Sequence, residues 1–293
     1  MRFEKWQALG NDYLIVDARE HGAPLQAEAV RRLCDRHAGV GADGVLELSD
    51  AGEPGYVARV RIVNPDGSEA ELSGNGVRQA VLYLRARGWT DARQFSVLTA
   101  AGEIRPTILS DSTCRMDMGR ARLRSPAFPT GGPDGTGELW VAGRPWSFQH
   151  VSVGNPQCAI ALGTPAEVDA LDVAAVGAQF ERSELFPQRT NVSFYALAPG
   201  AGGAEAGGAI RARIFERGVG ETASSGTGAC GAAVAHVLRG GDSPVTVRMD
   251  GGELEVEVGE DLHVDLTGWA VPVFAGEVDL QAFEARGAPD LKR

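Results

Sequence analysis

The chain has 293 residues, of which 43% are hydrophobic and 23% are charged, and its formal net charge is −11. This composition is typical of a globular protein, and the length suits one large domain or two ordinary ones. The acidic balance, without a basic block, argues against a nucleic-acid partner, and no apolar run reaches the roughly 18 residues that a membrane span needs.

The N-terminus enters an alternating strand pattern at once, so we expect no signal peptide. The four cysteines are scattered, with no CxxC pair. In a chain of this size they indicate reduced thiols in a cytoplasmic protein, not a disulfide framework or a zinc site. They are Cys34, Cys114, Cys158 and Cys230.

In the first part of the chain, residues 3–16 have the alternation of two short strands, with a turn at Gly10-Asn11 between them. Residues 26–37 have helical periodicity. The helix expected at 75–87 is apolar on most of its faces, which is typical of a central, buried helix, and Gly88 ends it. The strands expected in this part lie at 56–63, 95–99, 104–109 and 114–118.

In the second part, a segment rich in Pro and Gly at about 125–137 is the best candidate for a domain boundary. Helices are expected at 168–180 and 226–239, and a flexible hairpin tip at 199–208. The segment "GWAVPVFAGEVDL" predicts a final strand pair. The other strands expected here lie at 139–141, 146–153, 191–197, 245–249, 253–258 and 263–266.

One strand–loop–helix unit occurs twice. Residues 61–88 read "RIVNPDGSEAELSGNGVRQAVLYLRARG" and residues 213–240 read "RIFERGVGETASSGTGACGAAVAHVLRG". They match without a gap at an offset of 152, which pairs Ser73 with Ser225. Upstream, "VSVGNPQCAIAL" echoes "QALGNDYLIVD", at similar distances from the two serines. Two landmarks in the same order at similar spacing indicate an internal duplication.

The duplication predicts an α+β protein with two pseudo-symmetric halves, each built of mostly antiparallel short strands wrapped around a central buried helix. We expect ligands to bind in the cleft between the halves. The predicted divisions are an N-terminal half at 1–124, a C-terminal half at 125–269, final strands at 270–283 that return to the N-terminal half, and a tail at 284–293.

The repeated loop carries the candidate chemistry. Ser73 and Ser225 each stand directly before a glycine-flanked helix start. A serine there is ordinarily an N-cap that satisfies a free helix N–H. Two copies at equivalent positions also suit a shared anion, because exposed N–H groups and the helix dipole hold a carboxylate. Two opposed side chains across one carbon would then allow a two-base proton transfer, with the carbanion stabilised through that carboxylate.

At this point the sequence resembles the diaminopimelate epimerase family over nearly the whole chain. The motifs that carry the resemblance are "GND" at Asn11, "RHAGVGADGV", "NPDGSEAE", "GNGVR", "VSVGNPQC", "RTNVSF", "ERGVGET" and "GTGAC". The resemblance implies interconversion of LL- and meso-diaminopimelate, in lysine and peptidoglycan-precursor synthesis, without pyridoxal phosphate or a metal. It also implies a small amino-acid substrate with carboxylates, a homodimer, and a mechanism similar to that of proline racemases.

The resemblance also implies a set of site residues. Glu216 would tune or contact the reacting groups, and Arg217 would pair with the distal carboxylate, which suits a guanidinium fork. Asparagine side chains offer a donor and an acceptor together. The substrate contacts implied are Asn11, Asn64, Gly74, Asn75, Asn155, Asn191, Arg217, Gly226 and Thr227.

The sequence departs from the family pattern at the two acid/base positions. The family has cysteines there, and this chain has Ser73 and Ser225. The family's histidine after "GNP" is Gln157, and a further family cysteine is Gln79. A hydroxyl is a much weaker acid than a thiol and needs an adjacent base. Cys230 is interpreted as a buried free cysteine that does not replace the missing thiols.

Two origins are open for these serines. They can be engineered Cys→Ser replacements, or they can mark a natural branch of the family, which Gln157 and Gln79 favour. The chain could act as a slow epimerase through Ser73 and Ser225. It could instead be a lyase similar to hydroxyproline dehydratases, relatives in which serine or threonine replaces a cysteine, or a catalytically silent paralogue that binds an amino acid.

Overall fold

The computed structural model describes residues 1–71, 73–198 and 208–280. Most of the predicted hairpin tip and the whole predicted tail lie outside these residues. The chain forms two compact units, Met1–Cys114 with Trp269–Arg293, and Arg115–Gly268. Within the described ranges, the helices are too short or too polar to cross a membrane.

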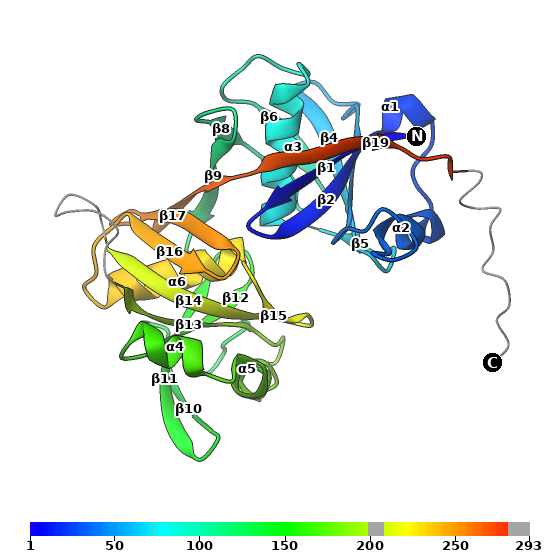
Figure 1. The fold of residues 1–293 in the computed structure, drawn as a ribbon. Helices are drawn as coiled ribbons and strands as arrows, with labels where there is room; N and C mark the ends of the chain where they lie inside the picture. The colour runs from blue at the N-terminus through cyan, green and yellow to red at the C-terminus, as the bar shows by residue number, and fades with distance from the viewer. Residues whose placement is uncertain (72, 199–207, 281–293) are drawn as a thin grey trace, which may run out of the picture. The chain divides into compact units, whose positions relative to one another are not determined.

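The first unit is a sheet wrapped on one buried helix (Figure 1). Strand order is β19-β1-β2-β3-β4-β6-β7, with β5 pairing β4. Helix α3 (Gly74–Ala86) is buried from Asn75 to Leu84 and packs against β1 to β4. The other elements are β1 (Arg2–Ala8), β2 (Asn11–Asp17), α1 (Ala18–His21), α2 (Ala27–Cys34), β3 (Val45–Ser49), β4 (Tyr56–Val63), β5 (Glu69–Ala70), β6 (Ser96–Thr99), β7 (Gly102–Ile104) and β19 (Val271–Glu277). Strand β8 (Pro106–Ile108) follows β7 in the chain but belongs to the second sheet.

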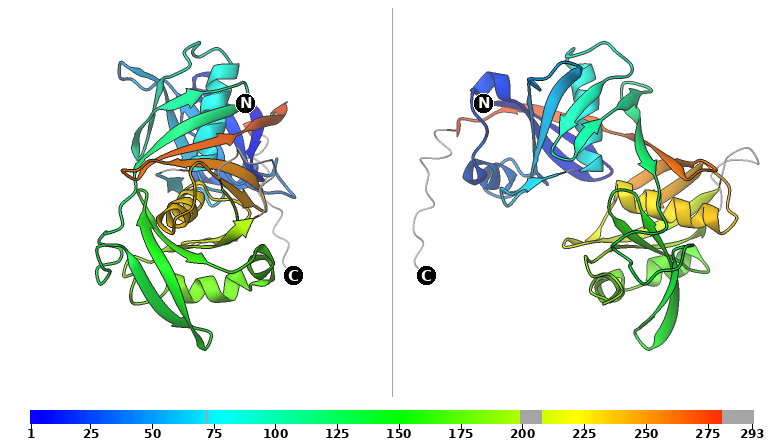
Figure 2. Two further views of the ribbon diagram at one scale, coloured as in Figure 1. Left: turned by 90° about the vertical axis from the view of Figure 1, so that its left-hand side faces the viewer. Right: turned by 180° about the vertical axis from the view of Figure 1, so that it is seen from behind.

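The second unit repeats this plan around α6 (Gly226–Leu238), which lies against its strands in both views of Figure 2. Strand order is β10-β11-β12-β13-β14-β16-β17-β18-β9-β8, with β15 pairing β14. The remaining elements are β9 (Thr113–Arg120), β10 (Thr136–Val141), β11 (Arg144–Ser152), β12 (Pro156–Ala161), α4 (Pro165–Ala170), α5 (Val173–Glu181), β13 (Asn191–Ala198), β14 (Ala209–Glu216), β15 (Gly220–Thr222), β16 (Val245–Met249), β17 (Gly252–Val258) and β18 (His263–Trp269).

The two units share one topology, which confirms the predicted fold class. The order β1-β2-β3-β4-β6-β7 corresponds to β11-β12-β13-β14-β16-β17. Each unit has parallel pairs at equivalent places: β2 with β3 and β4 with β6 in the first unit, and β12 with β13 and β14 with β16 in the second. A parallel pair requires a crossover, and helices supply it each time.

An ion pair repeats with the fold. Arg61 Nε lies 2.9 Å from Glu69 Oε2, and Arg213 Nε lies 2.8 Å from Glu221 Oε1. Each pair joins the strand that leads to a serine with the short strand that follows it. The loop that ends at each serine therefore leaves its sheet in the same way.

Local signals set both ends of the central helices. The Ser73 hydroxyl accepts from Gly76 N at 3.1 Å and the Ser225 hydroxyl accepts from Gly228 N at 3.3 Å, so both serines are N-caps. Beyond the other end, Gly88 (φ 69°) and Gly240 (φ 90°) adopt a left-handed conformation that suits glycine.

Three sequence predictions were wrong in detail. The helix expected at 168–180 is two helices, because the Asp172 side chain caps a new one by accepting from Ala175 N at 2.9 Å. The expected final strand pair is the single strand β19, since Trp269 still belongs to β18. The compact units divide after Cys114, not after residue 124, because β9 already pairs in the second sheet.

The second unit has an aromatic core. Its buried members include Trp146, Phe148, Phe180 and Phe194, which meet edge to face with centroids about 6 Å apart. The first unit has an aliphatic cluster in the corresponding role, which includes Leu14 and Val30.

Candidate functional site

Ser225 has a carboxylate partner. Its Oγ donates to Glu216 Oε2 at 3.1 Å, and the Thr222 hydroxyl fixes that carboxylate by donating to Oε1 at 2.7 Å. Glu216 ends β14 and Ser225 begins α6, so the strand–loop–helix unit itself brings them together. A hydroxyl with an adjacent carboxylate acceptor is the arrangement that a weakly acidic nucleophile or base requires.

Asn155 and Thr227 form the second pair in this unit. Asn155 Nδ2 donates to Thr227 Oγ1 at 3.2 Å, which joins the Gly-Asn turn to the first turn of α6. Gln157 Nε2 donates to Asn155 Oδ1 at 2.7 Å. The glutamine at the family's histidine position therefore orients a candidate substrate contact.

Asn191 organises the loop that carries Arg217. It donates to Pro156 O at 3.0 Å and accepts from Arg217 N at 2.9 Å, and it is buried. The Arg217 side chain is exposed and donates to Gln188 O at 3.0 Å. An exposed guanidinium with one backbone partner keeps donors available for a carboxylate.

In the first unit, Ser73 has a different partner. The buried Tyr13 hydroxyl donates to Ser73 Oγ at 3.3 Å. Asn75, on the first turn of the same helix, is buried and accepts from Arg78. Asn64 directly follows β4, and its amide donates to Ser68 Oγ at 3.0 Å.

Asn11 is held by a charged network that sequence reasoning missed. Its Nδ2 donates to Asp43 Oδ2 at 2.9 Å, and Arg36 bridges Asp43 Oδ1 and Asp12 Oδ1 at 2.7 Å each. Lys5 Nζ lies 2.6 Å from Asp12 Oδ2. Burial alone would raise the pKa of Asp12, but the hydrogen bonds from Arg36 and Lys5 outweigh it and lower the pKa to about 2. The sequence signal that could have revealed this network is the pair of charged residues Arg36 and Asp43 inside the "RHAGVGADGV" motif.

The cysteines are core residues. All four are buried and none forms a disulfide. Burial raises the pKa of Cys34 and Cys114 to about 12, and that of Cys158 well above the ordinary value. Cys230 is fully buried inside α6, which agrees with its interpretation as a structural residue.

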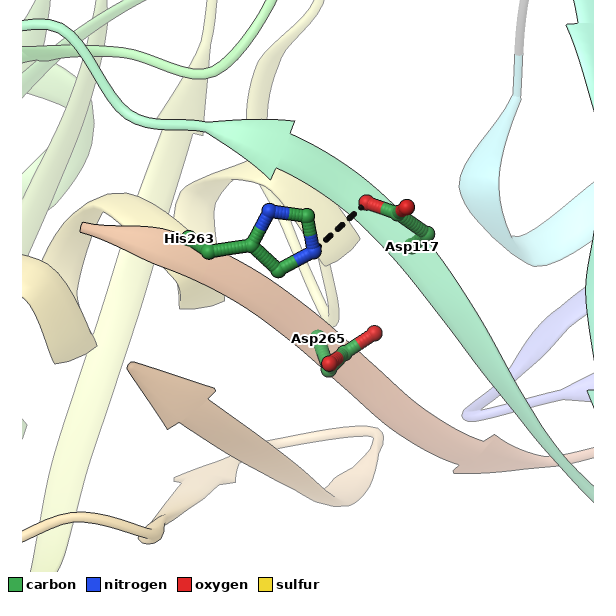
Figure 3. Close-up of side chains that lie close together, drawn as sticks. All are labelled: Asp117, His263 and Asp265. Atoms are coloured by element: carbon green, nitrogen blue, oxygen red, sulfur yellow. Dashed lines mark ion pairs between the residues drawn. The ribbon is translucent and has the colours of Figure 1, made fainter. Parts of the chain in front are cut away.

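A separate cluster has the composition of a metal site. The ligand atoms of Asp117, His263 and Asp265 lie within 4.8 Å of one another, on β9 and β18 (Figure 3). His263 Nε2 already pairs with Asp117 Oδ1 at 3.0 Å, and burial raises the pKa of Asp265. Such a donor set suits a divalent transition metal, but it shares no residue with either serine group, and we assign it no role.

Solved structures of other proteins share the fold of this chain. A Bacillus anthracis phenazine biosynthesis protein of the PhzF family is similar with a TM-score of 0.69 and 18% identity, over 95% of this chain and 98% of the other. A probable proline racemase from Agrobacterium radiobacter is similar with a TM-score of 0.66 and 16% identity, over 97% and 94%. At such identities the likeness establishes a two-unit α+β fold that these proteins share.

The sequence comparisons define the family. The diaminopimelate epimerase family model matches residues 3–124 and 149–273. Curated diaminopimelate epimerases are 40% identical in Synechococcus elongatus and 41% identical in Aromatoleum aromaticum, each over 96% of this chain and 99% of the relative. The chain therefore belongs to the diaminopimelate epimerase family, which places it among the amino-acid epimerases and racemases, a class of isomerases.

Proposed function

We propose that this protein interconverts LL- and meso-diaminopimelate by two-base proton transfer at the α-carbon. The observation that carries the proposal is the hydrogen bond from Ser225 to Glu216, because it supplies the base that a hydroxyl needs in place of a thiol. The substrate follows from the names of the relatives. The reaction is expected to be slow, since a serine hydroxyl is a much weaker acid than a cysteine thiol.

In this proposal Ser73 and Ser225 act on opposite faces of the α-carbon, and Glu216 serves Ser225. The amide N–H groups at Gly74 and Gly226 hold the α-carboxylate with the positive ends of the two helix dipoles. Arg217 takes the distal carboxylate. The remaining contacts proposed for the substrate are Asn11, Asn64, Asn75, Asn155, Asn191 and Thr227.

The test is α-proton exchange in deuterated water, with each isomer supplied separately. Exchange into both isomers, and its loss in the Ser73→Ala, Ser225→Ala double variant, would support the proposal. If neither isomer exchanges, while Ser73→Cys with Ser225→Cys restores exchange, the scaffold is an epimerase and the wild-type activity is absent.

One observation favours a second function. Glu216 has no carboxylate counterpart in the first unit, because the equivalent residue is Asn64. An elimination needs only one strong base, so a lyase acting on a hydroxylated amino acid is the second candidate. Release of water from hydroxyproline isomers, without exchange of diaminopimelate, would favour it. Saturable calorimetric binding without any turnover would instead indicate a silent paralogue.

We further propose that the protein is a cytoplasmic homodimer. Strand β19 is an edge strand of its sheet, and Val273 and Phe274 on it are 53% and 46% exposed. Exposed apolar side chains on an edge strand suit contact with a second chain. Sedimentation should show a dimer that Phe274→Glu weakens, whereas a monomer in the wild type would contradict the proposal.

A further inference from the structure

The two repeated serines have partners of opposite character. The Ser225 hydroxyl donates a hydrogen bond to a carboxylate, that of Glu216. The Ser73 oxygen instead accepts a hydrogen bond from a phenol, that of Tyr13. A phenol with a pKa of about 10 is a stronger acid than an aliphatic hydroxyl, so Tyr13 is the donor in that pair.

The partners of the two serines do not come from the internal repeat, because the equivalent residue in the other unit is different in each case. The residue equivalent to Glu216 in the first unit is Asn64, which bonds to Ser68. The residue equivalent to Tyr13 in the second unit is Gln157, which bonds to Asn155. Each unit has therefore acquired its own partner for the serine, from a different strand: β2 in the first unit and β14 in the second.

The position of Tyr13 is closely fitted. The side chain is 5% exposed, and its ring packs against Gly44. A Cβ on Gly44 would lie 2.6 Å from Tyr13 Cε1, so a residue without a side chain is needed there. The ring is thus confined, with its hydroxyl directed at the serine that caps α3.

The hydrogen-bond pattern leaves Ser73 ready to give a proton. Its oxygen accepts from both Tyr13 and Gly76 N, and among the described residues no side chain accepts its own proton. Ser225 is arranged in the reverse sense, because its proton is already directed at Glu216. In the resting state one hydroxyl is therefore set as an acid and the other as a base.

We propose that Tyr13 is the proton source for Ser73, and that Tyr13–Ser73 and Ser225–Glu216 act as an acid relay and a base relay in one reaction. This inference rests on the proposed function. Tyr13 is a positioning residue, since it acts through Ser73.

The two relays move protons in a fixed order. Ser225 Oγ takes the α-proton while its own proton moves to Glu216, and the C–H electron pair stays on the carbon, delocalised into the α-carboxylate. Ser73 then forms the new C–H bond on the opposite face, and Tyr13 returns a proton to Ser73. The protonated Glu216 and the Tyr13 phenolate are reset through water, and the reverse reaction uses the same steps backwards.

The first test uses activity. Tyr13→Phe should lower kcat for epimerisation by about 100-fold with little change in KM, because general acid catalysis is worth that order. It should also abolish exchange of the isomer whose α-hydrogen faces Ser73 and retain exchange, without inversion, of the other isomer. Glu216→Gln should have the opposite isomer preference. Tyr83→Phe, the same change on a buried tyrosine of α3, is the matched control.

The second test needs no turnover. A thiol introduced by Ser73→Cys should have its pKa lowered by the phenol, because a hydrogen bond favours the thiolate. Adding Tyr13→Phe should raise the pKa read from the pH profile of iodoacetamide alkylation by about one unit, whereas adding Tyr83→Phe should not. In Ser225→Cys the added Glu216→Gln should shift the profile the other way, because it removes a like charge.

The outcomes separate the two proposals. A wild type that exchanges neither isomer contradicts the proposed function and leaves the thiol profiles to decide on Tyr13. Thiol profiles that Tyr13→Phe and Tyr83→Phe change equally would overturn the inference. So would an active wild type in which Tyr13→Phe slows exchange of both isomers to the same extent.

Discussion

Asp12 has the most strongly shifted carboxylate near the candidate site, and its shift has a consequence for stability. The folded pKa of about 2 lies below the ordinary value of 3.8. A lowered pKa stabilises the fold at pH values above the unfolded pKa, and this contribution is lost as the pH falls through the folded pKa. The window is therefore between about pH 4 and pH 2.

We expect Asp12→Asn to lower the free energy of unfolding by roughly 2 kcal/mol near neutral pH. The difference in the free energy of unfolding between the variant and the wild type should shrink as the pH falls from about 4 to about 2. Urea unfolding at several pH values measures this, with the exposed Asp111→Asn as the control. A difference that stays constant down to about pH 2 would mean that the charge of Asp12 is not its cause.

The buried thiols give a second prediction for single residues. Since all four cysteines are buried and three have raised pKa values, a thiol reagent such as DTNB should label the native protein slowly. The denatured chain should release four equivalents at once. Rapid reaction of Cys230 in the native protein would contradict its structural role.

Part of the site was predictable from residues alone. The position of Ser73 and Ser225 at helix starts follows from the glycines around them, and the structure has both as caps. The contact of Tyr13 with Ser73 was not predictable, because it spans 60 residues of sequence. The Asn11–Asp43 contact spans 32 residues, and no periodicity encodes it.

Among the elements, the packing of α6 on β12 depends on Gly231. A Cβ there would lie 2.7 Å from Gln157 Cβ and 2.9 Å from Gln157 Cγ. The equivalent residue in α3 is Gln79, whose amide donates to Asn11 O at 3.0 Å. The buried glutamine therefore lies on the helix in the first unit, as Gln79 of α3, and on the strand in the second unit, as Gln157 of β12.

Gly231→Ala should therefore destabilise the protein by about 1–3 kcal/mol through overpacking. Combined with Gln157→Gly, which removes both clashing atoms, the loss should be clearly less than additive. Ala159→Gly, on the same strand, is the control partner and should add independently. Denaturant unfolding of each single and double variant measures the coupling, and full additivity with Gln157→Gly would contradict the packing argument.

Sequence patterns were informative for elements with one strong signal. The apolar helices and the strand at 56–63 follow from periodicity and burial, and β4 has those bounds. The break between α4 and α5 was missed, because the apolar residues on both sides keep a helical spacing across Asp172. The cap at Asp172, which restarts the helix, is a local competition that periodicity does not resolve.

For the whole molecule, each unit has its own sheet and its own core. Phe180 is fully buried in the aromatic core of the second unit. Phe180→Ala should cost about 3–5 kcal/mol of stability, and the loss should be local, because each unit has its own hydrophobic core.

Hydrogen–deuterium exchange measures this. Amides of Arg115–Gly268 should exchange faster in Phe180→Ala, and those of Met1–Cys114 should keep their wild-type rates. The reverse variant, Leu14→Ala in the core of the first unit, should give the reverse map. Equal acceleration throughout the chain would show that the two units unfold as one.

The pairing of β1 with β19 also orders events during synthesis on the ribosome. The two strands are joined from Arg2 to Gln7 on one side and from Val271 to Glu277 on the other. Strand β1 therefore has no partner on this side until β19 has been made. Until then an edge of backbone donors and acceptors stays open on the nascent chain, while every strand of the second unit has already left the exit tunnel. An edge of this kind is a place where unfinished chains can pair with one another.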